Sequence, residues 1–493
     1  MREEPTVAII GAGLSGVLVA IHLLSRPRGE RPRVYLIERR DGFGLGAAYS
    51  TENPSHLLNV RANNMSVFPD KPDHFLNWLR AKPEYDCATP CQFVPRKVFG
   101  AYLQSILRDL ACGPDGAGHL YLVTDEAVDV SPRNGGFAVR VAMGKEIVAD
   151  AVVLATGNLP PEPPAVPDDG FFDTKQYIAD PWAPHALDRV RPNDSVLLIG
   201  TGLTMVDVAM SLDTQSHLGR RVALSRRGLL PRQHDYVVRS PASSPPVLPL
   251  GLNAALASVR LHVQTAQEIG LDWRQVMDSI RPFIRNYWRA MTEADRKRFV
   301  RHLRPWWDVH RHRMAPDVAA HINAMIARGQ LSLQTGRLAR LSKSTNPGSD
   351  LIDVTWRPRA QTAFNVMRVN HIINCMGPGG DPRRSSMPLF KRLLTHGLVR
   401  AGPLRLGLDV DDDGRLISED GAPSPNLFAI GPPTRGVFWE ITAVPDIRVE
   451  AQRVAERLAE TLSNRNSWDT EAQIFSNERT GQASSLAQSA KLK

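Results

Sequence analysis

The sequence is poor in cysteine and lacks the motifs of common hydrolases. Only four of its 493 residues are cysteines, and no two have the C-x-x-C spacing of a redox pair. So few thiols exclude a disulfide-stapled fold, argue against a disulfide reductase and indicate a reducing, cytoplasmic compartment. Neither Gly-x-Ser-x-Gly nor His-Glu-x-x-His is present. We therefore expect no metal site, and the sequence indicates no catalytic side chain.

Long uncharged runs are also rare, and the one exception is interrupted by glycines. Residues 7–24 carry no Asp, Glu, Lys or Arg and are long enough to resemble a membrane span. Three glycines within six residues, and two acidic residues just upstream, argue against that interpretation. We therefore expect no membrane segment.

Acidic residues are scarcer than basic ones, since 51 Asp and Glu face 60 Lys and Arg, which gives a net charge of +9. A basic surface suits nucleic acid, an anionic membrane or anionic small molecules. No nucleic-acid-binding motif accompanies the charge. We therefore expect small molecules as partners, with no nucleic acid and no membrane, and the oligomeric state stays open.

What is present is a glycine-rich turn near the N-terminus, between an apolar strand and an apolar helix. Gly11, Gly13 and Gly16 have the spacing G-x-G-x-x-G. The first glycine allows the turn, the second lets a pyrophosphate approach the backbone, and the third lets helix and strand touch. Glu38 ends the next strand, residues 33–38, where a carboxylate accepts both hydroxyls of a ribose. Because a carboxylate repels a 2′-phosphate, this turn predicts FAD or NAD rather than NADP.

A second turn of the same kind follows a strand that begins near residue 194. Two glycines are kept, but Met205 stands where the first turn has its third glycine. That position packs helix on strand without touching pyrophosphate, so nucleotide binding survives the change. The matching strand end has a serine and two arginines, which suit a 2′-phosphate; the alternative is a solvated basic strand end. The residues expected to bind NADPH are Gly200, Gly202, Thr204, Ser225, Arg226 and Arg227.

Two turns with opposite charge at their strand ends predict two dinucleotides, FAD in the first and NADPH in the second. A protein that holds both passes hydride from nicotinamide to flavin. The predicted fold class is α/β, with two Rossmann-like dinucleotide-binding domains. Residues 1–165 and 366–465 are expected to form a discontinuous FAD domain, and residues 185–365 the NADPH domain. A helical insertion is expected at about residues 250–330, and residues 467–493 are expected to be a disordered tail.

These features resemble the two-dinucleotide-binding-domain flavoproteins, from residue 6 to about 462. The second turn, GTGLTMVDVA, is similar to the G-x-G-x-S-G-x-D-I-A motif of class B flavin monooxygenases, with Asp207 retained. Closer still are bacterial FAD/NAD(P)-binding oxidoreductases, which share FGLGAAYS, HLLNVRANNMS, DVHRHRMAP and FWEITAVPDIR. As a departure, Thr174 and Ile178 replace the glycine and histidine of the monooxygenase signature that precedes the second turn.

The resemblance implies further contacts to FAD. It places Asn59, Arg61 and Met65 in a segment that passes near the flavin, and Gly157 at the hinge between the domains. It also implies that a late strand delivers Gly431 to the flavin, and that a helix beginning near Pro445 points its N-terminus at the ring. The residues expected to bind FAD are therefore Gly11, Gly13, Gly16, Glu38, Asn59, Met65, Gly157 and Gly431.

The predicted insertion is strongly basic, because residues 281–313 contain ten Lys and Arg against three acidic residues. One interpretation is a lid that closes over the flavin and binds an anionic substrate or the NADPH phosphates. The competing interpretations are a solvated arginine face and a core position for the tryptophans. In the lid interpretation the substrate-binding residues are Trp307, His310, Arg311 and Arg313.

Together these features predict an FAD-dependent, NADPH-consuming oxidoreductase. The main hypothesis is a monooxygenase that uses O₂ to oxygenate a small nucleophilic substrate, such as an amine, through a flavin hydroperoxide. The first alternative is an NAD(P)H-dependent flavin reductase or dehydrogenase that never oxygenates a substrate. The second alternative is a non-catalytic scaffold that binds flavin and nucleotide.

Overall fold

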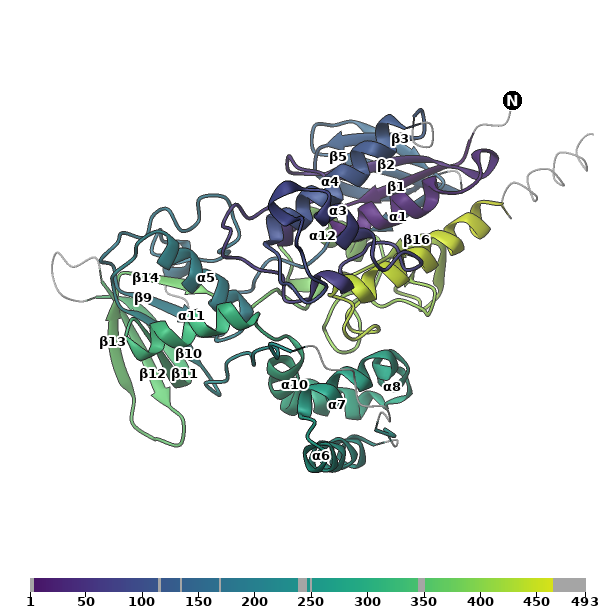
Figure 1. Ribbon diagram of the computed structural model, residues 1–493. Coiled ribbons are helices and arrows are strands. Elements are labelled where there is room, and N and C mark those ends of the chain that lie inside the picture. The colour runs from purple at the N-terminus through teal and green to yellow at the C-terminus, as the bar shows by residue number, and fades with distance from the viewer. Residues whose placement is uncertain are drawn as a thin grey trace, which may run out of the picture.

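The computed structural model describes residues 4–113, 117–133, 135–167, 170–237, 246–248, 251–344 and 351–463. The chain forms two α/β lobes, with a group of helices beside the first of them (Figure 1). Within these described ranges, no helix is both long enough and apolar enough to cross a membrane. The expected tail, residues 467–493, lies outside the described residues.

The first lobe is built on a six-stranded sheet whose neighbours are parallel except for the last pair at one edge. Its strand order is β15 (Arg415–Ile417), β16 (Pro423–Ala429), β7 (Ala151–Leu154), β1 (Thr6–Ile10), β2 (Arg33–Glu38) and β3 (Leu120–Thr124). β1 and β7 are buried along their whole length, as central parallel strands are. A separate antiparallel sheet holds β4 (Ala127–Arg133), β5 (Gly136–Val141) and β6 (Glu146–Ala149).

The helices of this lobe come from both halves of the chain. They are α1 (Leu14–Leu24), α2 (Gly46–Tyr49), α3 (His74–Arg80), α4 (Arg96–Cys112), α12 (Pro388–Thr395) and a C-terminal helix over residues 444–463. One apolar core joins α1, the central strands and the C-terminal helix. The C-terminal helix begins one residue before Pro445, near the predicted start.

The second lobe has a seven-stranded sheet with parallel strands in its centre and an antiparallel pair of additions at one edge. Its order is β13 (Asn365–Val369), β12 (Ile352–Pro358), β11 (Leu331–Lys343), β10 (Arg221–Ser225), β9 (Val196–Ile199), β14 (His371–Asn374) and β8 (Tyr177–Ile178). The helices α5 (Leu203–Thr214) and α11 (Pro316–Ala327) share a core with β9 and β10.

The predicted domain boundaries are too narrow for this second sheet. β8 lies before residue 185, and β14 lies after residue 365. β14 pairs in parallel with β9, just as β7 pairs with β1 in the first lobe. The physical reason is that β9, as a central strand, needs a hydrogen-bonding neighbour on both sides, and β14 supplies the second.

Two extended segments run side by side where the chain passes between the lobes. Leu159 and Gly379 form an isolated antiparallel bridge. The side-chain amide of Asn374 donates to the carbonyl oxygen of Glu162 at 2.8 Å. The hinge implied at Gly157 is therefore a paired connection rather than a single strand.

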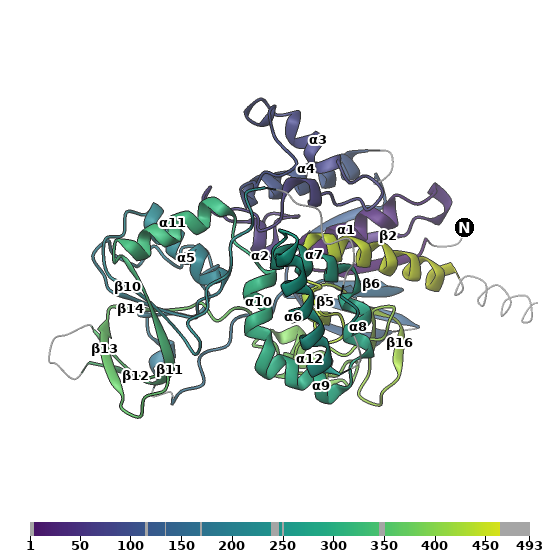
Figure 2. The ribbon, with the colours of Figure 1, turned by 60° about the horizontal axis from the view of Figure 1, so that its bottom comes forward.

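The predicted insertion is helical, and we refer to its helices as the helical subdomain. They are α6 (Leu252–Glu268), α7 (Trp273–Ile280), α8 (Ile284–Ala290), α9 (Glu293–Arg298) and α10 (Arg304–Arg311). Figure 2 shows these helices beside the first lobe. Their apolar core includes Trp439 of the first lobe, and Leu406 packs against it. The insertion was expected to be part of the NADPH domain, but it packs on the FAD side of the molecule.

A stripe of arginines explains this packing. Arg281 forms an ion pair with Asp446 at 2.9 Å, and Arg285 pairs with Glu450, both on the C-terminal helix. Arg289 pairs with Asp412. The three arginines are spaced four residues apart, which places them on one helical face. The stripe that the sequence left open as a solvated face is therefore a docking surface for the first lobe.

Candidate functional site

The first glycine turn is closed by backbone on two sides and open on the third. A side chain on Gly11, whose φ is +103°, would meet the carbonyl oxygen of Ala155 at 2.4 Å. A Cβ on Gly16 would lie 1.9 Å from the carbonyl oxygen of Gly11. A Cβ on Gly13 would make only an ordinary contact, 3.5 Å from the Cα of Gly46. Gly13 therefore leaves room at the start of α1, where the backbone N–H groups of a helix suit a phosphate.

Glu38 and Gly431 both reach this turn. The Glu38 carboxylate accepts a hydrogen bond from the backbone N–H of Ala12 at 3.0 Å and another from Arg40 at 3.2 Å. These bonds hold the carboxylate at the strand end and leave acceptor capacity for ribose hydroxyls. Gly431 has φ +76°, and a Cβ there would meet Oγ of Ser15, in the first turn of α1, at 2.5 Å. The loop after β16 therefore lies against the same helix start.

The other residues expected to contact FAD have different surroundings. Met65 is 1% exposed and lies in the core of the first lobe. The carbonyl oxygen of Asn59 accepts a bond from His234 of the second lobe at 3.0 Å. Arg61 bonds to the backbone oxygens of Cys91 and Asp235, so it also joins the lobes. These contacts make the segment an interlobe connection, and its approach to the flavin stays a prediction.

Gly157 keeps space around it. Its φ is +70°, and a Cβ there would find no atom within 4 Å. It follows β7, at the start of the paired connection between the lobes. The residue is placed where the hinge was predicted, with room for a ligand beside it.

The second glycine turn repeats the geometry of the first. Gly200 has φ +114°, and a Cβ would meet the carbonyl oxygen of Cys375 at 2.4 Å. A Cβ on Gly202 would find no atom within 4 Å. Thr204 is the second residue of α5 and is partly exposed. Met205 is fully buried in the core that α5 shares with α11, so the side chain that replaces the third glycine is a packing group.

The three polar side chains at and just after the end of β10 have different surroundings. The Ser225 hydroxyl accepts a bond from the N–H of Gly228 at 3.0 Å and contacts the Thr201 hydroxyl at 2.9 Å, so it shapes the turn. Arg227 donates to the carbonyl oxygen of His302 at 3.0 Å. Arg226 is exposed, and no carboxylate pairs with it in the described part of the chain. Of the two arginines, Arg226 is therefore the one whose guanidinium is exposed, and its contact with a 2′-phosphate stays a prediction.

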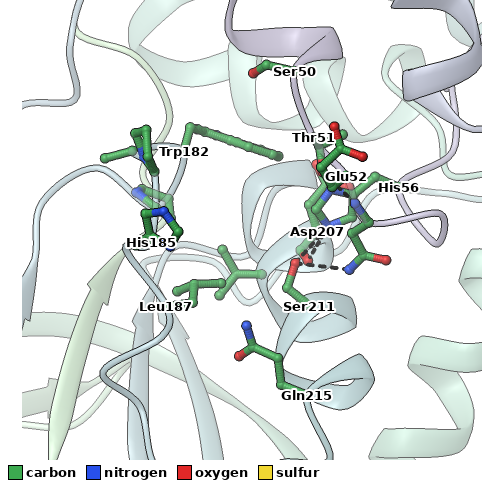
Figure 3. A pocket seen from close by; sticks show the side chains of 15 residues that line it. Ser50, Thr51, Glu52, His56, Trp182, His185, Leu187, Asp207, Ser211 and Gln215 are labelled. Carbon is green, nitrogen blue, oxygen red and sulfur yellow. Dashed lines mark hydrogen bonds between the residues drawn. The ribbon is translucent and has the colours of Figure 1, made fainter.

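A cavity of ≈ 270 Å³ lies where the two lobes meet (Figure 3). Its walls come from residues 50–56 of the first lobe, residues 181–187 of the connection and α5 of the second lobe. Trp182 and His185 face His56 and Ser211 across it. The cavity lies beside the body of α5 rather than at its N-terminal turn, so it is separate from the glycine turn of the second lobe.

Hydrogen bonds beside this cavity join the lobes, and we call them the interlobe clasp. The guanidinium of Arg96 donates to the carboxylate of Asp207 at 2.8 Å. His56 Nε2 lies 3.0 Å from the carbonyl oxygen of Asp207 and 2.8 Å from Oγ of Ser211. Burial lowers the pKa of His56, so the imidazole is neutral at neutral pH. The aspartate retained in the second turn is thus committed to holding α5 against the first lobe.

The predicted substrate residues do not form one group. Trp307 Nε1 donates to Glu440 at 2.6 Å, and Arg311 forms an ion pair with the same carboxylate at 2.9 Å. Arg313 pairs instead with Asp278, and His310 Nδ1 contacts the carbonyl oxygen of Trp306 at 2.7 Å. Both arginines are thus neutralised by carboxylates.

Glu440 is the buried centre of this network, and sequence analysis did not select it. Burial alone would raise the pKa of Glu440, but the charge of Arg311 and the hydrogen bond from Trp307 help to hold the pKa below its usual value. The backbone of Glu440 has φ +75°, a conformation that residues other than glycine rarely adopt. Arg311 lies in the segment DVHRHRMAP and Glu440 in the segment FWEITAVPDIR. Both segments are recognisable in the sequence, but nothing in the sequence shows that they contact each other.

The two turns, their strand ends and the paired connection define a two-lobed, dinucleotide-binding α/β fold of the kind found in flavoproteins. Residues 8–159 match the family model described as FAD-NAD(P)-binding. The first lobe therefore carries an FAD/NAD(P)-binding domain, and the predicted fold class is confirmed.

A relative of known activity is the L-aspartate N-monooxygenase (nitrosuccinate-forming) of Streptomyces cremeus, 28% identical over 309 residues. The match covers 55% of this chain and 44% of that protein. A similar protein of Streptomyces davaonensis matches at 27% identity over 43% of this chain and 39% of its own length. The chain therefore spans less than half the length of these curated relatives.

Among solved structures, the fold is similar to the ornithine N-hydroxylase of Kutzneria sp. 744, a complex with reduced FAD, NADP⁺ and L-ornithine. The TM-score is 0.62 at 15% identity, covering 94% of this chain and all of that one. These matches confirm the predicted resemblance to two-domain flavoproteins related to flavin monooxygenases.

Proposed function

We propose that this protein is an FAD-dependent, NADPH-consuming N-monooxygenase that oxygenates the amino group of a small amino acid. The observation that carries the proposal is the pair of glycine turns in one chain, both open at the second glycine and opposite in charge at the strand end. The relatives that act on aspartate and ornithine support an amine as the oxygenated group.

The residues of the first turn fit FAD. The space beside Gly13 and the N-terminus of α1 would hold the pyrophosphate, with Glu38 on the adenosine ribose. Gly202, Thr204 and Arg226 would hold NADPH in the second lobe. When bound, the flavin supplies the redox chemistry, so that R–NH₂, O₂, NADPH and H⁺ give R–NHOH, NADP⁺ and H₂O.

The helical subdomain would exclude water from the reaction. Trp288 stacks on Trp439 with ring centroids 4.7 Å apart, and Phe299 packs edge-on at 5.3 Å. Trp288 Nε1 also donates to the carbonyl oxygen of Gly436 at 3.1 Å. These contacts cover the loop that follows Gly431. A dry environment there protects reactive flavin species from solvent.

The test is a coupled measurement on the purified yellow protein. NADPH oxidation should accelerate when a small amino acid such as L-aspartate is added, and mass spectrometry should find one ¹⁸O atom in the amine product after reaction under ¹⁸O₂. Release of one H₂O₂ per NADPH without an oxygenated product would contradict the proposal and favour the flavin reductase.

A further inference from the structure

The helical subdomain and the loop after Gly431 enclose a group of charges that does not balance. Its members are Arg304, Asp308, Arg311, His312, Arg435 and Glu440. Arg304 pairs with Asp308 at 3.3 Å, and Arg311 pairs with Glu440 at 2.9 Å. Burial lowers the pKa of His312, which is therefore neutral at neutral pH. The group keeps one positive charge in excess, and that charge is on Arg435.

Arg435 differs from Arg304 and Arg311 in its ion pairing, although Arg311 also has buried nitrogens without a hydrogen bond. Within the described ranges, no carboxylate pairs with Arg435 and its Nε atom is buried without a hydrogen-bond partner. Burial lowers the pKa of Arg435 to about 10, so the guanidinium is still charged at neutral pH. Arg435 is partly buried. A partly buried guanidinium without a carboxylate partner is costly, and an anionic ligand removes part of that cost.

The position of Arg435 is rigid. The guanidinium carbon lies 5.0 Å from the ring centroid of Trp439, and the Trp439 ring is held by Trp288 and Phe299. The Trp439 indole N–H is a second buried donor that lacks a partner in the described part of the chain. The Thr434 hydroxyl donates to the carbonyl oxygen of Gly431 at 2.9 Å, which fixes the turn that carries Arg435.

Two cofactor phosphates offer competing explanations, and the geometry disfavours both. The expected 2′-phosphate contact is Arg226, at the end of β10 in the other lobe. The expected pyrophosphate position is the N-terminus of α1, which Gly431 touches through Ser15, while Arg435 is four residues further along the chain. The charge of Arg435 is instead felt by Asp308 of the helical subdomain and by Glu440 of its own loop.

We propose that Arg435 binds a carboxylate of the amine substrate, so that the protein selects amino acids over simple amines. A guanidinium and a carboxylate match in shape and form two parallel hydrogen bonds. This inference rests on the proposed function and deepens it by assigning a residue that recognises the substrate's carboxylate. It also transfers the role of anion binding from Arg311 and Arg313, which are paired, to a residue outside the insertion.

The first experiment measures binding without turnover. Calorimetric titration of the anaerobic holoenzyme with succinate, and separately with L-aspartate, should detect binding to the wild type. Arg435→Gln should weaken both affinities by about 100-fold, as expected for a desolvated ion pair. Arg435→Lys should retain part of the affinity, and Arg298→Gln, an exposed arginine paired with Asp295, should change nothing. Wild-type protein that binds neither carboxylate overturns the inference, as does equal affinity in Arg435→Gln.

The second experiment separates a substrate carboxylate from a cofactor phosphate. Arg435→Gln should keep its FAD content and its KM for NADPH, while the ratio of kcat/KM for L-aspartate to that for 1,5-diaminopentane falls. Loss of FAD or a raised KM for NADPH would instead assign Arg435 to a cofactor. Because the calorimetry needs no oxygenation, carboxylate binding that depends on Arg435 stands even if no oxygenated product forms. If Arg435→Gln oxygenates the substrate with an unchanged ratio of kcat/KM values, this inference is overturned and the proposed function stays intact.

Discussion

The two glycine turns of this protein are nearly the same in backbone and opposite in chemistry. Gly11 donates its N–H to Ile37 at 2.8 Å, and Gly200 donates to Leu224 at the same distance. In both turns, a Cβ added to the first glycine would lie 2.4 Å from a carbonyl oxygen at the end of the neighbouring strand. The strand that follows ends at a carboxylate, Glu38, in one lobe, and is followed directly by two arginines in the other. In the proposed function, the backbone would provide the phosphate site and the strand end would select which dinucleotide binds there.

The third glycine position shows a second difference. In the first turn a Cβ at Gly16 would collide with the Gly11 carbonyl oxygen. In the second turn the same position holds Met205, whose side chain is fully buried in the core. Helix and strand therefore tolerate a side chain in one lobe and exclude it in the other. This difference concerns packing, while the difference at the strand ends concerns the ligand.

We expect the largest effects on cofactor binding from substitutions at the second glycine of each turn. Gly13→Val should fold, because a Cβ has room there, but should be purified without colour since the side chain fills the pyrophosphate space. Gly202→Val should stay yellow and lose reduction by NADPH. Flavin absorbance and anaerobic bleaching check both variants. A yellow Gly13→Val protein would contradict the assignment of FAD to the first turn.

The third position should separate packing from binding. Met205→Ala should lower the free energy of unfolding by about 3 kcal/mol, because it leaves a cavity in the core shared by α5 and α11. The KM for NADPH should change little in the folded variant. Denaturant unfolding and steady-state kinetics test this, and a large rise in KM at full stability would show that Met205 contacts the coenzyme.

The strand ends should decide coenzyme preference. Arg226→Ala should raise the KM for NADPH by about 30-fold and leave NADH unaffected, because only NADPH carries a 2′-phosphate. Arg227→Ala should have a smaller effect, since its guanidinium already donates to His302. Arg337→Ala, an exposed arginine of the same lobe, is the control. Equal losses with NADPH and NADH would refute the 2′-phosphate assignment.

The interlobe clasp adds a small dependence on pH. Because the pKa of His56 in the folded protein lies below 6.5, the unfolded chain binds the proton more readily. Stability should therefore fall as pH drops below about 6.5 and stay constant above it. His56→Gln should make the decrease of Tm between pH 6.5 and 5.5 smaller than in the wild type. An unchanged slope would place the titrating groups elsewhere, for example at His234, whose pKa burial lowers to about 3.

Local patterns could be predicted from the sequence, because each depends on residues close together in the chain. The predicted strand at residues 33–38 coincides with β2, and helices α6 to α10 lie within the range predicted for the helical insertion. The turns at Gly11 and Gly200 follow the same logic. Steric demands of a tight turn and hydrophobic periodicity act within a few residues, so they are visible before the fold is known.

The contacts that organise the candidate site could not be predicted in this way. Arg281 and Arg285 have the spacing of a solvated helical face, and their partners on the C-terminal helix lie far along the chain. Arg435 is isolated only because the neighbouring arginines find carboxylates in three dimensions. The predicted end of the NADPH domain at residue 365 leaves out β14. This strand pairs with β9, a partner that hydrophobic periodicity does not identify.

The most direct test of the central claim is an anaerobic titration of the purified protein with NADPH, followed by absorbance. The account predicts that one NADPH bleaches one bound FAD, and that NADH achieves the same only at much higher concentration. A protein that holds no flavin, or a flavin that NADPH does not bleach, would show that the two turns do not serve as a donor and acceptor pair.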